Sequence, residues 1–171
     1  MAELWLLRHG ATTWAQEGRH TGRTDLPLLP EGEAEARRVA PLLQQLGGHP
    51  FAAVLVSPLQ RARRTAELAG LGEQAQLCDD LLEWNYGAYE GITTATIRET
   101  VPGWTVWSHG CPEGEDSAAV QLRCERVIAP WLRPWQQAAP ARGWPWWPTA
   151  TSCAAWRAPG WGWGQAAGRC W

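Results

Sequence analysis

Residues 4–10 read Leu-Trp-Leu-Leu-Arg-His-Gly, and they join a predicted strand to a candidate functional site. Its four apolar residues form a short continuous run, which is typical of a strand buried on both faces of a parallel sheet. The run ends at Arg8, His9 and Gly10. We therefore expect these three residues at the carboxyl edge of the sheet, where open α/β folds bind their ligands.

Strand and helix patterns alternate outward from this stretch. Ser57 and Pro58 supply an N-cap and a first-turn proline for one of the helices, and this places Arg61 in its first turn. The alternation predicts an α/β fold with a mostly parallel sheet and helices on both faces. After residues 4–7, the expected order is a loop at 18–30, a helix at 31–46, a strand at 51–56, a helix at 57–69, a strand at 76–82 and a helix at 116–131.

The composition excludes several classes of protein. Charged residues make up 19% of the 171 residues and the net charge is −2, which argues against a polybasic nucleic-acid surface. No run approaches the ~18 apolar residues of a membrane helix, and the N-terminus lacks the pattern of a signal peptide. The five cysteines are scattered and never spaced as metal ligands. We therefore expect a soluble cytoplasmic protein with reduced thiols, no metal, and neither a nucleic-acid nor a membrane partner.

A histidine between an arginine and a glycine at the end of a strand suits covalent phosphoryl transfer. The neutral imidazole of His9 can attack phosphorus, while guanidinium groups hold the other phosphate oxygens. Gly10 lets the backbone approach the phosphate. The alternative is a histidine at a strand end that only bonds a carbonyl oxygen, and three residues alone do not separate the two interpretations.

Four stretches of sequence resemble the histidine phosphatase (phosphoglycerate mutase-like) superfamily, in the order and spacing of that family. Residues 83–91, together with Trp107 and residues 111–115, are most similar to its sedoheptulose-bisphosphatase branch. The resemblance covers residues 3 to about 132. The four stretches are Leu-Leu-Arg-His-Gly-Ala-Thr-Thr-Trp (6–14), Thr-Gly-Arg-Thr-Asp-Leu-Pro-Leu (21–28), Ser-Pro-Leu-Gln-Arg-Ala-Arg-Arg-Thr-Ala (57–66) and Glu-Trp-Asn-Tyr-Gly-Ala-Tyr-Glu-Gly (83–91).

The resemblance implies a reaction and a role for each matching residue. His9 would be the nucleophile that becomes phosphohistidine, and Glu83 the general acid that protonates the leaving group and then activates water. Arg8 and Arg61 would bind the phosphate. Gly10, Thr21 and Gly22 would contact the substrate, a small phosphorylated metabolite such as a sugar phosphate. No cofactor is implied.

The remaining residues of interest have simpler interpretations. Ala11 and Ala15 stand where many relatives carry Glu and Asn, which changes the hydrogen bonding expected on the phosphate side of the site. The other histidines lack a motif, and we expect them to be surface or packing residues. They are His20, His49 and His109.

Residues 133–171 differ in composition from residues 1–132. They contain no acidic residue and no Leu, Ile, Val, Phe, Tyr or Met, and seven of the 14 Trp fall in the last 28 residues. We expect an incomplete phosphatase domain at 1–132 followed by a Trp/Pro/Gly/Ala-rich tail at 133–171 without a readable element. The strand and helices that end the family's fold would then be missing or replaced.

The genetic code offers an explanation for the tail. The family has a late Val-Ala-His-Gly-His strand, but this chain has no His after His109. When the codons from Pro145 onward are read two bases later, Val and Ala are forced, and His-Gly-His is allowed at the following three positions. We therefore hypothesise a shift of reading frame between residues 132 and 144, with impaired activity as its consequence. The alternative is a Trp-rich tail that contacts carbohydrate or membrane.

Two other functions stay open beside hydrolysis. The first is mutase-type transfer, although family mutases carry Lys-containing insertions after the general acid, whereas this chain has no Lys and only about 30 residues between Glu83 and Gly114. The second is a catalytically inactive remnant or binding module.

Overall fold

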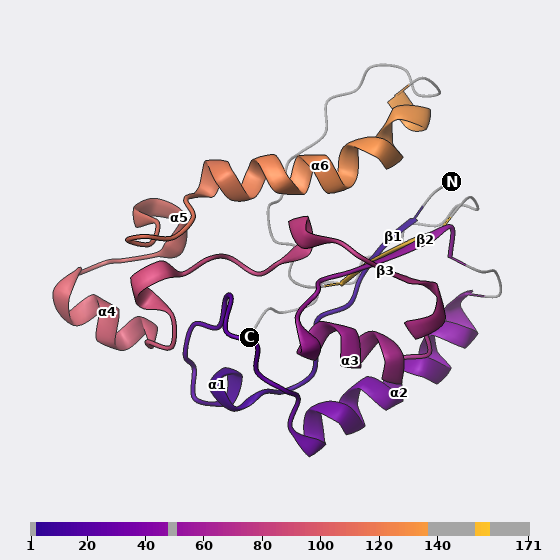
Figure 1. Ribbon diagram of the computed structural model, residues 1–171, viewed down its shortest axis with the longest axis horizontal. Coiled ribbons are helices and arrows are strands. Elements are labelled where there is room, and N and C mark those ends of the chain that lie inside the picture. Colours follow the sequence, from indigo (N-terminus) through magenta and orange to yellow (C-terminus); the bar gives the residue numbers. More distant parts are fainter. Residues whose placement is uncertain (1–2, 48–50, 137–152, 158–171) are drawn as a thin grey trace.

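The computed structural model describes residues 3–47, 51–136 and 153–157. Its helices and strands follow the expected alternation through β3, and then three helices separate β3 from the last strand (Figure 1). The strands are β1 (Glu3–Leu6), β2 (Ala53–Val56), β3 (Ala75–Leu77) and β4 (Cys153–Arg157). The helices are α1 (Thr13–Gln16), α2 (Pro30–Gly47), α3 (Gln60–Leu68), α4 (Thr94–Thr100), α5 (Val106–His109) and α6 (Ser117–Gln136), with 3₁₀ turns at Gly72–Gln74, Asp79–Leu81 and Gly87–Tyr89.

The four strands form one sheet in the order β1-β4-β2-β3. β2 and β3 pair in parallel, whereas β4 is antiparallel to both β1 and β2. The strands β1, β2 and β3 therefore run in one direction, and their carboxyl ends meet at one edge of the sheet. The expected α/β fold is confirmed, with α2 and α3 on one side of the sheet and α6 on the other (Figure 1).

The end of the chain differs from the expectation. The tail was expected to contain no element, but α6 continues to Gln136 and β4 lies between β1 and β2. Strand pairing uses the backbone N–H and C=O groups, which every non-proline residue carries, so a segment without apolar periodicity can still occupy a sheet. Within the described residues, β4 is the one strand that runs against the others. The expected loss of the helices after it concerns residues outside the described ranges.

The core lies between the sheet and the α2–α3 layer. Val54 and Val56 are 2% and 1% exposed, and they pack against small side chains of α3, which lets the helix lie close to the sheet. β1 was expected to be buried on both faces, but Leu4 and Leu6 are 44% and 53% exposed. The prediction is wrong for this face because the α2–α3 layer covers only the other one, where Leu7 meets the core.

Two element boundaries also need correction. Ser57 was expected to cap α3, but the helix begins at Gln60, and the Gln60 backbone N–H donates to Asp25 Oδ1 at 2.8 Å. The cap thus comes from a loop 35 residues earlier, which no local sequence signal can predict. The strand expected at 76–82 is shorter, because β3 ends at Leu77 and a 3₁₀ turn follows at Asp79–Leu81.

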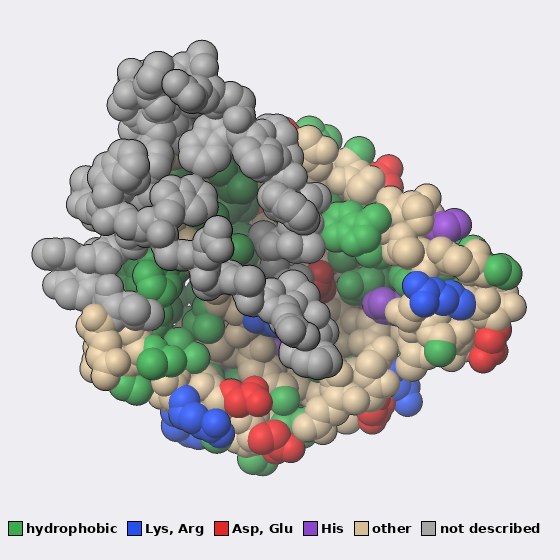
Figure 2. Space-filling model, turned by 180° about the vertical axis from the view of Figure 1, so that it is seen from behind, with side chains coloured by type: hydrophobic (Ala, Val, Ile, Leu, Met, Phe, Trp, Pro, Cys, Tyr) green, Lys and Arg blue, Asp and Glu red, His purple; other side chains and the backbone are tan. Residues whose placement is uncertain are grey.

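The described surface agrees with the composition. Acidic and basic side chains are interspersed over the face in Figure 2, with no broad area of one sign. In the part of the chain that the structure describes, no helix is long and apolar enough to cross a membrane.

Candidate active site

The candidate site lies at the edge where β1, β2 and β3 end. His9 follows β1, and its Nδ1 atom lies 2.7 Å from the carbonyl oxygen of Gly10. Because a carbonyl oxygen only accepts hydrogen bonds, Nδ1 carries the proton in the neutral ring and the lone pair is on Nε2. Burial, with Arg61 and Arg8 nearby, lowers the pKa of His9 to about 4. At pH 7 the ring is therefore neutral and Nε2 is available as a nucleophile.

Gly10 fixes the position of this histidine. A Cβ atom on Gly10 would lie 2.2 Å from the carbonyl oxygen of Gly32, so the chain after β1 contacts the first turn of α2 backbone to backbone. The Gly10 N–H also donates to Thr65 Oγ1 of α3 at 3.3 Å. The glycine therefore has a packing role in addition to the substrate contact that the sequence predicts.

Arg61 lies inside the molecule rather than on a solvated helix face. Its side chain is 1% exposed and donates to three carbonyl oxygens of one loop. These belong to Thr24 (2.8 Å), Thr21 (3.2 Å) and Gly22 (2.9 Å). A guanidinium has five N–H groups, so two are left for another acceptor such as a phosphate oxygen. The carbonyl oxygens of Thr21 and Gly22, two residues expected to contact substrate, thus also hold the side chain of Arg61.

Glu90 holds the same loop from its other side. Its Oε1 atom accepts the backbone N–H groups of Gly22 (2.8 Å) and Thr24 (2.9 Å). The loop therefore lies between the Glu90 carboxylate, which accepts hydrogen bonds from its N–H groups, and the Arg61 guanidinium, which donates hydrogen bonds to its carbonyl oxygens. Glu90 is part of the 83–91 stretch, but only the folded chain reveals its contact with a loop 66 to 68 residues earlier.

Glu83 stands near Arg61 and Arg8, the two arginines that the sequence predicts to bind phosphate. Its Oε1 atom accepts the Trp84 backbone N–H at 2.8 Å. Burial raises the pKa of the Glu83 carboxyl, while that N–H and the charges of Arg61, Arg123 and Arg8 oppose the rise. A raised pKa keeps the proton on a carboxyl closer to neutral pH, which favours a general acid over a permanent anion.

The four central residues of the prediction share one electrostatic environment. Arg8 and Arg61 both lower the pKa of His9, and both act on the carboxyl of Glu83. Within the described residues, no cluster of three or more His, Cys, Asp or Glu side chains could hold a metal ion. The thiols of Cys78, Cys111 and Cys124 are free, while the side chains of Cys153 and Cys170 lie outside the described part.

Two of the other histidines have packing or surface contacts. The ring of His20 lies 4.6 Å from that of Tyr86 and 5.3 Å from that of Trp104, and its Nε2 atom is 3.1 Å from Thr94 Oγ1. His109 is exposed at the end of α5. His49 lies outside the described residues.

The low pKa of His9 leads to a prediction about stability. The unfolded histidine, with a pKa of 6.5, binds more protons than the folded one, so the free energy of unfolding should fall as the pH drops from 6.5 to about 4. The loss is about 2–3 kcal/mol. Urea unfolding at pH 7 and pH 4.5 measures it, with His9→Gln as the reference that lacks the titration. Equal pH dependence in both proteins would contradict the burial of a neutral His9.

A comparison with known proteins agrees with this geometry. The model of the histidine phosphatase superfamily (branch 1) matches residues 4–138. An acid phosphatase of Mycobacterium tuberculosis is 46% identical over 127 residues, which cover 74% of this chain and 61% of that protein. The sedoheptulose 1,7-bisphosphatase of Saccharomyces cerevisiae is 35% identical over 144 residues, covering 72% of this chain and 53% of that protein. The chain thus spans between half and two thirds of the length of these relatives.

The solved structures agree on the fold. A phosphoglycerate mutase from Thermus thermophilus superposes with a TM-score of 0.57 at 39% sequence identity. The superposition covers 75% of this chain and 71% of that one.

Proposed function

The chain belongs to the histidine phosphatase superfamily, and on that premise we propose that its site hydrolyses a phosphomonoester of a small metabolite through a phosphohistidine at His9. The observation that carries the proposal is the neutral His9, whose free Nε2 atom stands in the field of Arg8 and Arg61. The family includes phosphatases and mutases, and the acid phosphatase and bisphosphatase relatives favour hydrolysis. A sugar phosphate in the cytoplasm is the substrate class we propose.

The first chemical step transfers the phosphoryl group to the protein. The lone pair of His9 Nε2 attacks phosphorus, a P–N bond forms, and the P–O bond to the alcohol breaks. Arg8 and Arg61 balance the charge of the phosphoryl oxygens, while protonated Glu83 gives its proton to the leaving alkoxide. The alcohol leaves, and Glu83 is then a carboxylate.

The second step returns the site to its starting state. The Glu83 carboxylate takes a proton from water as the water oxygen attacks phosphorus and the P–N bond breaks. Inorganic phosphate leaves and His9 is neutral again. Each group ends the cycle in the protonation state in which it began.

Mutase-type transfer is the second candidate, because a phosphoglycerate mutase shares the fold. A mutase transfers the phosphoryl group from the histidine to a hydroxyl group of the retained substrate, whereas a phosphatase transfers it to water. Release of inorganic phosphate, measured beside isomerisation of phosphoglycerate, separates the two. The absence of Lys from the whole chain favours hydrolysis, since the expected mutase insertions contain Lys. A catalytically inactive binding module is the third candidate.

We further propose that residues 133–171 are read in a shifted frame and that the activity of this chain is impaired as a result. The family match ends at residue 138, inside the 132–144 window, which supports the proposal. Resequencing the gene tests the shift directly. An uninterrupted, verified frame would leave the tail as a genuine part of the protein.

Trapping the phosphohistidine tests the function itself. The full chain is incubated with p-nitrophenyl phosphate, quenched in alkali, which preserves phosphohistidine, and mapped by mass spectrometry. We expect an acid-labile phosphate on His9 and none in His9→Asn. Absence of the label from both this chain and a chain with the restored frame would overturn the proposal. p-Nitrophenyl phosphate hydrolysis by the 171-residue chain at rates typical of the family would overturn the proposed impairment.

A further inference from the structure

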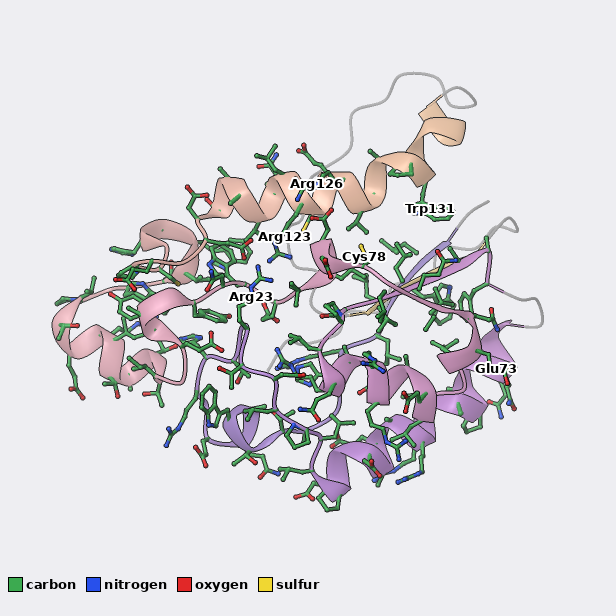
Figure 3. All side chains as sticks on the ribbon, in the orientation of Figure 1. Arg23, Glu73, Cys78, Arg123, Arg126 and Trp131 are labelled. Carbon is green, nitrogen blue, oxygen red and sulfur yellow. The ribbon has the colours of Figure 1, made fainter. Side chains whose placement is uncertain are left out.

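Arg123 is the most buried charged residue outside the proposed reaction, among the residues that the structure describes. It projects from α6 toward the chain that precedes Glu83 (Figure 3), and it is 7% exposed. Its Nη1 atom donates to the carbonyl oxygens of Asp80 (2.9 Å) and Leu82 (2.5 Å). Nε and Nη2 donate to the two carboxylate oxygens of Glu115, at 2.9 and 3.2 Å. These contacts join α6 to the Asp79–Leu81 turn, to Leu82 after it, and to Glu115 in the loop before α6.

Glu115 continues the network on the other side of Glu83. Its Oε2 atom accepts the Asn85 backbone N–H at 2.8 Å, and its backbone N–H donates to the Asn85 carbonyl oxygen at 2.9 Å. The Glu115 carbonyl oxygen also accepts the Trp84 indole N–H at 2.8 Å. The chain is therefore fixed just before and just after Glu83, and the ion pair between buried Arg123 and half-buried Glu115 connects the two fixed points.

We propose that Arg123, acting with Glu115, is the positioning residue for Glu83, and that α6 thereby sets the direction in which this carboxyl faces. The inference rests on the role of Glu83 in the proposed function. A buried guanidinium that satisfies two carbonyl oxygens and one carboxylate is hard to replace, because the carbonyl oxygens of Asp80 and Leu82 would lose this donor. The Glu115 carboxylate would keep the Asn85 N–H and an ion pair with Arg23 at 3.6 Å. The backbone at Leu82 and Asn85 then has little freedom to rotate Glu83 away from the site.

Arg126 provides a matched control on the same helix. It donates to the carboxylate of Asp80 at 2.9 and 2.5 Å, but its side chain is 61% exposed and none of its described hydrogen bonds reaches residues 82–85. Arg126→Met therefore removes a contact between α6 and the Asp79–Leu81 turn without removing the support of Glu83. Arg123→Met removes that support.

The experiment measures the pKa of Glu83 in the full 171-residue chain by ¹³C NMR of its side-chain carboxyl, assigned with Glu83→Gln. The groups that face this carboxyl are Arg61 of α3, Arg8 after β1, Arg123 itself and the Tyr86 hydroxyl. Loss of a positive charge alone would raise the pKa. Loss of positioning turns the carboxyl toward water and lowers the pKa toward the ordinary 4.5.

We expect Arg123→Met to lower the pKa of Glu83 and Arg126→Met to leave it unchanged. Arg123→Lys, which keeps the charge but loses the planar fork, should lower it less, and this variant decides the result if Arg123→Met does not fold. A rise or no change in a folded Arg123 variant would overturn the proposal, and so would an equal fall in Arg126→Met. The titration needs no turnover, so its failure is distinct from a failure to phosphorylate His9.

Discussion

Restoring the reading frame upstream of residue 145 is expected to raise the kcat/KM for p-nitrophenyl phosphate about 10²–10³-fold over the original chain. One inserted base brings the codons after the insertion into the frame that allows Val-Ala-His-Gly-His. The resemblance places the first histidine of that motif in the phosphate pocket, and one preorganised donor to a developing charge is worth a factor of this size. Arg8 and Arg61 alone would otherwise face the transferred phosphoryl group.

The control for this prediction removes only the added histidine. Its codon overlaps those of Pro148 and Thr149, and its replacement by alanine in the restored chain should return the rate to near that of the original. If the original chain and the restored chain hydrolyse the substrate at equal rates, the tail is not the cause of an impairment. If the alanine variant keeps the full gain, the restored fold rather than the histidine supplies it.

Replacing Glu83 by Gln is expected to slow turnover by about 10²–10⁴-fold in the restored chain, because glutamine neither donates a proton to the alkoxide nor accepts one from water. p-Nitrophenolate is a good leaving group that needs little protonation, so phosphorylation of His9 should slow less than hydrolysis of the phosphohistidine. We therefore expect a burst of p-nitrophenol and a phosphohistidine that persists on His9, as followed by rapid-quench kinetics.

Glu73→Gln is the matched control, because Glu73 is an exposed carboxylate on the Gly72–Gln74 turn (Figure 3). It should leave both the burst and the turnover unchanged. Unaltered turnover in Glu83→Gln would assign the acid to another residue.

The sequence predicted the elements of the fold better than their ends. Apolar runs and helical periodicity located β1, α2, β2, α3 and α6, since these patterns reflect the face that each element buries. The start of α3 was misplaced because its cap comes from Asp25, a contact that depends on the folded loop. β4 was missed because its pairing is a property of the backbone, whereas its composition carries no strand signal.

In the candidate site, too, the residues with a sequence motif were predicted and the residues that act through distant contacts were not. His9, Glu83, Arg8 and Arg61 were identified by motif, and their mutual electrostatic effects agree with a common site. The supporting contacts of Glu90 and Arg123 were not predicted. Each contacts a segment about 40 to 70 residues distant, and a lone Glu in a turn or Arg in a helix has no spacing that distinguishes it from a solvated residue.

The backbone contact between Gly10 and Gly32 means that the start of α2 helps to hold His9 in place. The Leu29 N–H donates to the carbonyl oxygen of Ala11 at 2.9 Å, and a Cβ atom on Gly32 would lie 2.4 Å from that same oxygen. The segment after β1 and the first turn of α2 are thus in direct backbone contact, with no side chain between them that could change its rotamer. A displacement of this end of α2 therefore also displaces the backbone next to His9, and with it the imidazole ring.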